Sequence, residues 1–425
     1  MHISSVSAGD AIVPGPRGSA EAARLAWSAL QPDRWPLPLA AFPSGAALVG
    51  GAVRDALLQR LGPEPDLDLV VEGDAIALCR QLSKRHGGSA VVLDAERSIA
   101  RLVIQGWSVD LARLEGGTLL SDLQRRDYTV NAMALPLADQ TALVDPHGGL
   151  HHLEERQLVA IAEANLLDDP LRLLRGIRLA TELHFQLDPT SEGWIQEHRG
   201  RLQQVAGERV LAELEKLSNA PAGEEGLLQC LQWGLLSPWQ GIDQGSPLPQ
   251  LNPSQARALG LRERDCATAL PLARLAAVLD AEGLKALRSS RKLQQRVERL
   301  RRWQSRLNHQ RPLQDAEALP EAERLQLHLE LELDLPALLL SWPTEAAQGW
   351  LRRWEDGSDP LFHPKPAIDG LTLQRDLGLK ASPQLGALLQ FLMLERAFGR
   401  LKGEGEALQK AEQWLRSTTA SSPED

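Results

Sequence analysis

Short apolar runs alternate with amphipathic segments between residues 46 and 144. The runs are 46-AALV-49, 68-DLVV-71, 90-AVVLD-94 and 101-RLVIQGWSVDLA-112, and residues 53–61 and 74–87 repeat apolar positions with helical spacing. The pair 90–94 and 101–105 is typical of a hairpin, so part of the predicted sheet is antiparallel. This pattern predicts an α/β unit.

Beyond residue 152 the periodicity is almost wholly helical. Apolar residues recur at three- and four-residue spacing in 166–183, 208–217 and 388–401. Residues 241–253 and 357–366 have the composition of connections, and residues 1–45 form a lead-in around one short helical pattern at 19–30. We therefore predict an α+β protein, with a mixed sheet near its N-terminus and a helical extension.

Composition is that of an ordinary globular protein of two to four units, with 425 residues, 43% hydrophobic and 24% charged. No signal-peptide pattern and no apolar run of ~18 residues is present, so we expect a cytoplasmic protein without a membrane partner. Three separated cysteines argue against zinc knuckles and disulfides. The net charge of −10 does not decide about nucleic acid, because one face can differ from the average.

Two aspartates stand on alternate positions of an apolar run. Asp66 and Asp68 would lie side by side on one face of a strand, with Leu67 and Leu69 on the other. Two such carboxylates repel each other unless a cation lies between them, and Mg²⁺ suits hard oxygen ligands and phosphate. An isolated pair of this kind is more often acidic decoration of a strand edge.

A glycine turn precedes these aspartates by one helix. Gly50 and Gly51 follow a buried-type strand and open a helix, where backbone N–H groups can approach an anion closely. Arg54, one turn into that helix, can add its guanidinium to the same phosphate. The sequence thus predicts an anion cradle beside a metal pair.

A third acid, Asp110, interrupts the strand 107-WSVDLAR-113. A buried carboxylate is costly unless it is paired or metal-bound, and two metals on either side of a phosphoryl displacement would use such a trio. The alternative is an ion pair with Arg113 or a turn cap.

These residues belong to a set of five ordered motifs. The segment GGAVRDALLQ…DLDLVVEG (50–73) is followed by 125-RRDYTVNAMAL-135, 145-DPHGGLHHL-153, 168-DDPLRLLRGIRLA-180 and 208-ERVLAELEKL-217. Together they closely resemble the class II tRNA nucleotidyltransferase and bacterial poly(A) polymerase family of the polymerase-beta superfamily. A weaker likeness covers 369–389.

The resemblance implies a polymerase-beta-like palm over 46–152, a neck over 153–220 and a helical body and tail over 221–425 that bind RNA. It implies transfer of CMP or AMP from CTP or ATP to the 3′ end of tRNA without a template, with two Mg²⁺ ions. Carried over residue by residue, it assigns metal binding to Asp66 and Asp68 and catalysis also to Asp110.

The same resemblance assigns nucleotide contacts. Gly50, Gly51 and Arg54 match the triphosphate-binding turn; one of Arg125 and Arg126 should reach the nucleotide beside Asp127, and Asn131 should brace the site. On the helix predicted over 168–178, Asp169 and Arg172 would share a face and complement the Watson–Crick edge of cytosine or adenine. The remaining arginines of that helix, which would extend toward the triphosphate, are Arg175 and Arg178.

Two alternatives accompany these assignments. Taken without the other motifs, the segment 168–178 is more typical of an Asp N-cap followed by solvent-facing arginines, and family members commonly have Glu where this chain has Asp168. The histidines His147, His151 and His152 lack a fourth ligand, and we assign them to structure.

The segment 111-LARLEGGTLLSDLQ-124 is short. Family members that add all of CCA carry a mobile loop here, and its shortening is expected in the branch that adds two cytidines and leaves the last adenosine to a separate A-adding enzyme. Gly116 and Gly117 could still supply a hinge, which keeps complete CCA addition open.

The segment 288–311 holds nine basic residues and one acid. It would lay positive charge along RNA through Arg291, Lys292, Arg299 and Arg302, with Trp303 stacking on a base. The alternative is an amphipathic helix with a core of Leu293, Val297, Leu300 and Leu307. For the whole chain, the alternatives are A addition, poly(A) synthesis, which the acidic end 421-SSPED-425 disfavours, and a non-catalytic RNA-binding relative.

Overall fold

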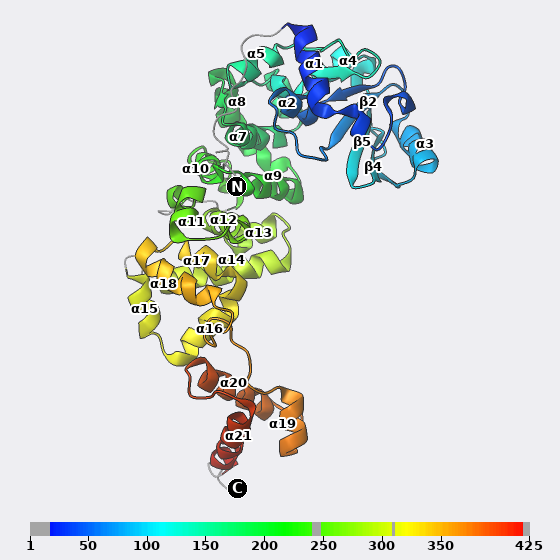
Figure 1. Ribbon diagram of the computed structural model, residues 1–425. Coiled ribbons are helices and arrows are strands. Elements are labelled where there is room, and N and C mark those ends of the chain that lie inside the picture. Colours follow the sequence, from blue (N-terminus) through cyan, green and yellow to red (C-terminus); the bar gives the residue numbers. More distant parts are fainter. Residues whose placement is uncertain (1–17, 240–247, 308–310, 420–425) are drawn as a thin grey trace, which may run out of the picture. The chain divides into compact units, whose positions relative to one another are not determined.

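The computed structural model describes residues 18–239, 248–307 and 311–419 (Figure 1). The chain forms two compact units, Met1–Val205 and Ala206–Asp425. Residues 1–17 of the predicted lead-in, 240–247 around one predicted connection, 308–310 of the basic segment and the acidic residues 421–425 lie outside the described part. The unit boundary lies inside the predicted neck, and the four domain ranges stay predictions.

The first unit is built on a six-stranded mixed sheet of order β3-β4-β5-β2-β1-β6. Its strands are β1 (Ala47–Val49), β2 (Leu67–Val71), β3 (Ser89–Asp94), β4 (Ile99–Ile104), β5 (Trp107–Arg113) and β6 (Ala134–Pro136). Strands β2 and β5 are parallel, and the β3–β4 hairpin is antiparallel as predicted. This mixed sheet with helices confirms the α+β class.

The apolar run 101–112 forms two strands. Gln105 and Gly106 have φ angles of 50° and 88°, which are the left-handed conformations of a tight two-residue hairpin turn. The turn reverses the chain between β4 and β5, so the run cannot be one continuous strand.

Helices cover the buried face of this sheet. Helix α1 (Ser19–Leu30) agrees with its prediction, and α2 (Gly51–Leu57) follows β1. Helix α3 (Ala75–His86), which is capped by the Asp74 side chain, packs against β4, β5 and β3 (Figure 1). Buried residues such as Leu69, Leu102 and Leu111 fill this layer, each at most 1% exposed.

The segment predicted as one helix over 166–183 is two helices, α6 (Glu163–Asp168) and α7 (Leu171–Leu183). The break falls at Asp169, which has extended backbone angles of −135° and 94°. Asp169 precedes Pro170, and the proline ring disfavours helical angles in the residue before it. Helix α8 (Pro189–His198) follows.

The second unit is helical throughout its described residues, as predicted. Its helices are α9 (Gly207–Asn219), α10 (Gly223–Gln232), α11 (Pro253–Leu259), α12 (Glu263–Val278), α13 (Ala281–Ala286), α14 (Arg291–Arg306), α15 (Pro312–Ala318), α16 (Glu321–Leu331), α17 (Leu335–Leu339), α18 (Thr344–Glu355), α19 (Gly370–Leu377), α20 (Pro383–Ala397) and α21 (Glu404–Thr419). Arg274 is 1% exposed and binds the buried Glu224 and the carbonyls of Ser218 and Ala220, which joins α12 to α9 and α10.

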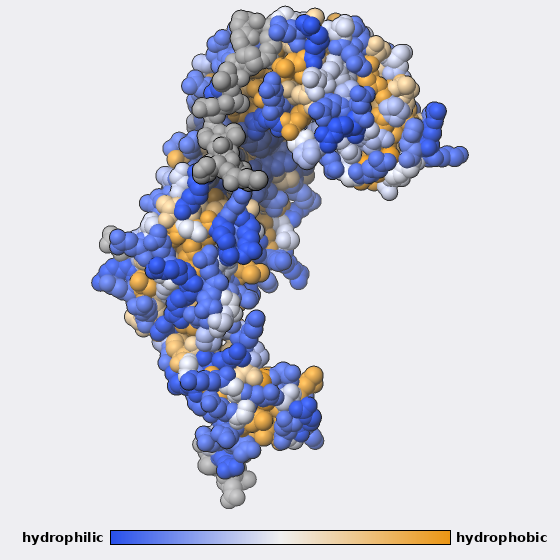
Figure 2. Space-filling model, viewed as in Figure 1, coloured by the Kyte–Doolittle hydropathy of each residue, from blue (hydrophilic) through white to orange (hydrophobic). Residues whose placement is uncertain are grey.

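Most of the surface on the face drawn in Figure 2 is hydrophilic, with smaller apolar areas on both units. Among the described helices, none combines the length and the apolar character that crossing a membrane requires.

Candidate functional site

Asp68 lies on the open face of the sheet, in the middle of it. Its neighbours in β2, Leu67 and Leu69, are each 1% exposed on the other face, as predicted from the alternation. Asp68 is paired in register with Asp110 of β5 on one side and with Val49 of β1 on the other. Asp66 is exposed and immediately precedes the strand. The fold thus brings Asp68 and Asp110 onto neighbouring strands.

The electrostatics at Asp68 favour a bound cation. Burial and, after it, the Asp110 carboxylate raise the pKa of Asp68, and against the opposing effect of Arg126 the pKa reaches about 6. A carboxylate that is costly to ionise in the free protein is one that a divalent cation would relieve. The carboxylate oxygens of Asp66 and Asp68 are the kind of ligand that Mg²⁺ prefers.

Asp110 is held by an arginine that the sequence analysis did not identify. Arg101 of β4 is its register partner and donates to it twice, Nε to Oδ1 at 2.7 Å and Nη2 to Oδ2 at 2.8 Å. The alternative prediction of an ion pair between Asp110 and Arg113 is wrong, because Arg113 donates instead to the carbonyl of Glu96. The alternation of β4, which places Arg101 opposite its apolar residues, was the available signal.

Among the described residues, the one group of three potential ligands within 4.8 Å of one another is Glu163, Glu197 and His198. The three aspartates are therefore not gathered around one point. The predicted structural role of the histidines agrees with His152, whose Nδ1 lies 2.8 Å from the Thr129 hydroxyl.

The glycine turn lies beside the Asp68 carboxylate. Gly50 has φ and ψ angles of 76° and −139°, which only glycine adopts readily, and a Cβ there would lie 3.3 Å from Asp68 Oδ2. Gly51 begins α2, and Arg54 in that helix is 9% exposed. Arg54 donates to Asn131 at 2.6 Å and to both oxygens of Asp55 at 2.9 Å.

The two adjacent arginines differ in their surroundings. Arg126 forms an ion pair with Asp122 at 2.9 Å, and its positive charge lowers the pKa of Asp68. Its guanidinium would lie 3.5 Å from a Cβ placed on Gly50. Arg125 points to Glu115 at 3.1 Å, and 57% of its side chain is exposed. Arg126 therefore faces the carboxylates and the glycine turn, whereas Arg125 faces the segment 111–124.

Asp127 lies at the centre of a buried network. It is 4% exposed, accepts from the Tyr128 N–H at 2.8 Å and from Asn131 at 3.3 Å, and lies 3.1 Å from Arg175. Burial would raise its pKa, but Arg175 and these hydrogen bonds outweigh burial and hold the pKa below its usual value. Asn131 thus connects Arg54 to Asp127. Its role in bracing a nucleotide site stays a prediction.

The predicted pair Asp169 and Arg172 does not share a helix face. Asp169 lies in the link between α6 and α7, and its carboxylate accepts from the Leu171 N–H at 3.3 Å. Arg172 is in α7 and donates to the Asn165 carbonyl at 2.8 Å. Burial lowers the pKa of Arg172, while the Asp127 and Asp169 charges oppose that change, so the two predicted partners remain electrostatic neighbours.

Farther along α7, Arg178 is 8% exposed and pairs with Glu182 one turn later. This contact runs along the helix. Its predicted direction toward a triphosphate stays a prediction.

Helix α14 in the second unit has a basic outer face and an apolar inner face. Arg291, Lys292 and Arg299 are exposed and form no ion pair with another described residue, whereas Arg302 pairs with Glu330. Val297, Leu300 and Leu307 are buried as the amphipathic alternative predicts, and Leu293 is half-buried.

Trp303 is 4% exposed and donates to Glu330 at 2.8 Å. The predicted stacking of Trp303 on a base is therefore wrong, because the ring is part of the core.

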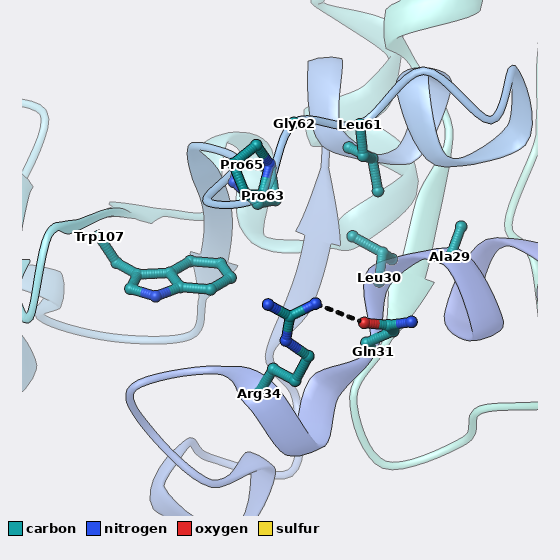
Figure 3. Close-up of a pocket in the computed structure, with 9 residues that line it drawn as sticks. All are labelled: Ala29, Leu30, Gln31, Arg34, Leu61, Gly62, Pro63, Pro65 and Trp107. Atoms are coloured by element: carbon teal, nitrogen blue, oxygen red, sulfur yellow. Dashed lines mark hydrogen bonds between the residues drawn. The ribbon is translucent and has the colours of Figure 1, made fainter. Parts of the chain in front are cut away.

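Two hollows of the first unit lie apart from the aspartates. A cavity of about 210 Å³ between α1, the 61–65 loop and Trp107 holds one charged side chain, Arg34, which donates to Gln31 (Figure 3). The second, of about 410 Å³, is lined by the segment following β5 and by the β3–β4 turn, including Arg97, Arg113 and Arg125. Neither cavity is lined by Asp66, Asp68 or Asp110.

Comparison with known proteins identifies relatives of this chain. Residues 108–159 match the poly A polymerase head domain family, and residues 184–240 match the family described as a probable RNA and SrmB-binding site of polymerase A. A CC-adding tRNA nucleotidyltransferase of Synechocystis sp. is 35% identical over 398 residues, with 89% of this chain and 95% of the relative covered. An A-adding tRNA nucleotidyltransferase of Deinococcus radiodurans is 40% identical over 49% of each chain.

Solved structures share the fold. A CCA-adding enzyme in complex with CTP superimposes with a TM-score of 0.69 at 22% identity, covering 93% of this chain and 98% of the other. The Thermotoga maritima CCA-adding enzyme complexed with tRNA gives a TM-score of 0.64, also at 22% identity, over 87% of this chain and 91% of that one.

Proposed function

Because the chain belongs to the class II tRNA nucleotidyltransferase family, whose members are enzymes, we propose that it transfers CMP from CTP to the 3′ end of tRNA. The observation that carries this proposal is the position of Asp68 between the glycine turn and Asp110. A phosphate above Asp68 would have an anion-binding turn on one side and a second carboxylate on the other.

Asp66 and Asp68 are the residues that would hold Mg²⁺, with Asp110 as the third acid. Bound Mg²⁺ lowers the pKa of an attacking hydroxyl and neutralises triphosphate charge. The protein itself would hold the triphosphate through the N–H groups at Gly50 and Gly51 and through Arg126, with Arg54 behind them. Asn131 and Asp127 keep Arg54 in place.

Base selection would fall to Asp169 and Arg172. Cytosine offers an exocyclic amine to a carboxylate and a ring nitrogen to a guanidinium, and adenine offers the same pair. In the described structure both side chains are fixed by local contacts, Asp169 by the Leu171 N–H and Arg172 by Asn165. The proposed base contacts therefore come from two elements, the α6–α7 link and α7.

Two observations support addition of two cytidines rather than of complete CCA. The segment between β5 and Arg125 is occupied by a 3₁₀ turn (Glu115–Gly117) and by α4 (Leu119–Gln124), which Thr118 caps. Glu115 ties the turn to Arg125. The relative with 95% of its length covered is a CC-adding enzyme. In this proposal a separate A-adding enzyme completes the tRNA in the cytoplasm.

Primer extension tests the proposal directly. Purified full-length protein is incubated with Mg²⁺ and two transcripts, one tRNA lacking CCA and one ending in CC, with CTP, ATP or both, and products are resolved at single nucleotides. We expect two cytidines and a stop on the first transcript and no reaction on the second. Completed CCA would refute the CC-only proposal, and a long adenosine tract would indicate poly(A) synthesis. No product on either transcript would refute the transferase proposal.

A further inference from the structure

The open face of the sheet continues past the carboxylates in two registered rows. Asp68, Asp110, Arg101 and Val91 are register partners across β2, β5, β4 and β3. Ser108, Val103 and Ser89 form the second row. Directly paired residues point to the same face of the sheet, so the side chains of both rows lie on one surface. We call the part of this surface formed by Val91, Arg101 and Val103 the β3–β4 floor.

This floor is exposed although it is partly apolar. Val91 is 47% exposed and Val103 is 43% exposed. On the other side of Asp68 the same face is closed, because Val49 and Val70 pack with Leu114 and Leu123 in a buried cluster. Asp68 therefore lies at the edge of a surface that opens in one direction, over β5, β4 and β3.

The geometry of phosphoryl transfer indicates from which side of Asp68 the attacking hydroxyl approaches. The attacking and leaving oxygens lie roughly in line on opposite sides of the reacting phosphorus. Gly50 follows β1, and a Cβ on it would lie 3.3 Å from Asp68 Oδ2 and 3.5 Å from Arg126, so the triphosphate and its leaving group belong on that side. The attacking hydroxyl must then come from the Asp110 side, where the β3–β4 floor begins.

We propose that the β3–β4 floor binds the terminal nucleotides of the single-stranded 3′ end of the acceptor RNA. The inference rests on the proposed function. Neighbouring strands lie ~4.8 Å apart, so Val91, at the far end of the floor, lies roughly 14 Å from Asp68. The valine side chains offer apolar contact to riboses and bases, and the Arg101 guanidinium, 42% exposed beside Asp110, offers a positive charge to a phosphate.

Another occupant of this region would be a second copy of the chain. β3 is the edge strand of the sheet and its backbone could pair with another edge. Such pairing would run through the backbone of β3, so substitutions on either face of the strand should affect it similarly. The RNA proposal involves only the face that carries Arg101 and the carboxylates, and this difference makes the two occupants separable by experiment.

Val91 and Val92 provide a matched pair for the test. They are adjacent on β3, are 47% and 42% exposed, and point to opposite faces of the strand. We would measure kcat and the KM values for tRNA lacking CCA and for CTP in the full-length wild type and in the V91E, V91K and V92E variants. Thermal melting confirms that each variant is folded.

We expect V91E to raise the KM for tRNA by roughly tenfold through repulsion of a nearby phosphate, with the KM for CTP unchanged. V91K should lower the KM for tRNA, and the effect of both variants should shrink as salt is raised. V92E should match the wild type. Opposite effects of opposite charges at one position would not arise from a merely structural disturbance.

Equal behaviour of V91E and V92E, or an unchanged KM for tRNA in V91E and V91K, would overturn the inference while leaving the proposed function in place. If light scattering shows that the wild type is a dimer and that both V91E and V92E are monomers, β3 pairs with a second copy of the chain. That result would also overturn the inference. If the wild type transfers no CMP to tRNA, the proposed function and this inference fail together.

Discussion

The Tyr128 hydroxyl donates a hydrogen bond of 2.9 Å to the backbone carbonyl of Arg172. Tyr128 is the single tyrosine of the chain and is fully buried. It directly follows Asp127, which lies 3.1 Å from Arg175. The segment after the two adjacent arginines is thus anchored to α7 at two points, and the proposed triphosphate and base contacts are held by one rigid arrangement.

Gly176 should be intolerant of alanine for the same reason. A Cβ at this position would lie 2.1 Å from the Tyr128 hydroxyl oxygen and 2.9 Å from its ring. We expect Gly176→Ala to lower the free energy of unfolding by about 1–3 kcal/mol, despite the better helix propensity of alanine. Urea denaturation of the full-length protein measures this change.

Tyr128→Phe removes the atom that the alanine would meet. By itself, Tyr128→Phe should lower the free energy of unfolding by about 1 kcal/mol, because the hydrogen bond to the Arg172 carbonyl is lost. The double variant should be less destabilised than the sum of the two single variants. Strict additivity in this cycle would contradict the proposed contact.

Asp68→Asn should abolish transfer and yet stabilise the metal-free protein. Burial raises the pKa of Asp68 from 3.8 to about 6, so the folded state holds this proton more tightly than the unfolded chain. The stability contributed by the group is fully present below pH 3.8 and is lost as the pH rises through about 6.

At pH 7.5 in EDTA we expect Asp68→Asn to raise the free energy of unfolding by about 1–3 kcal/mol, because one pKa unit corresponds to ~1.4 kcal/mol. At pH 4 the two proteins should differ little. Adding Mg²⁺ and CTP should raise the melting temperature of the wild type but not of the variant. A variant that still transfers CMP would remove Asp68 from the proposed metal site.

Asp169→Ala should relax base choice. Without the carboxylate, the amine of cytosine loses its acceptor, so incorporation from UTP or GTP should rise relative to CTP by roughly tenfold, the loss expected for one charged hydrogen bond. Single-turnover extension with each nucleotide separately measures the ratio. Asp168→Ala, at the exposed neighbouring position, is the control and should keep the wild-type ratio. Unchanged selectivity in Asp169→Ala would exclude this residue from base selection.

His328 should make the protein sensitive to mild acid. It is 1% exposed and packs against Trp350 and Phe362, and burial lowers its pKa to about 3, with Arg353 contributing. A lowered pKa means that its contribution to stability is complete above the unfolded-state value of 6.5 and is lost as the pH falls toward about 3.

As the pH falls from 7 to 5, His328 should lower the free energy of unfolding of the wild type by about 2 kcal/mol, because the unfolded chain takes up the proton and the folded chain does not. Urea titrations at the two pH values, followed by tryptophan fluorescence, measure the difference. His328→Gln, which cannot titrate, should show a pH dependence smaller by that amount. An identical pH dependence would show that His328 is accessible to protons in the folded state.

The sequence by itself determined the elements whose signals are local. Alternation placed Asp68 opposite Leu67 and Leu69, and apolar spacing predicted α1 and the helical second unit, because these patterns depend only on residues a few positions apart. The five motifs likewise identified the family, since they preserve residue types in order along the chain.

Only the tertiary structure decided which of those residues meet. The pairing of Asp110 with Arg101 depends on the register of β4 with β5, and the difference between Arg125 and Arg126 depends on whether Glu115 or Asp122 lies nearby. Trp303 proved to be core because Glu330 of another helix accepts its indole N–H. The contacts of Asp110 with Arg101, of Arg125 with Glu115 and of Trp303 with Glu330 join residues 9, 10 and 27 positions apart, and the distance between such residues is set by folding rather than by any local pattern.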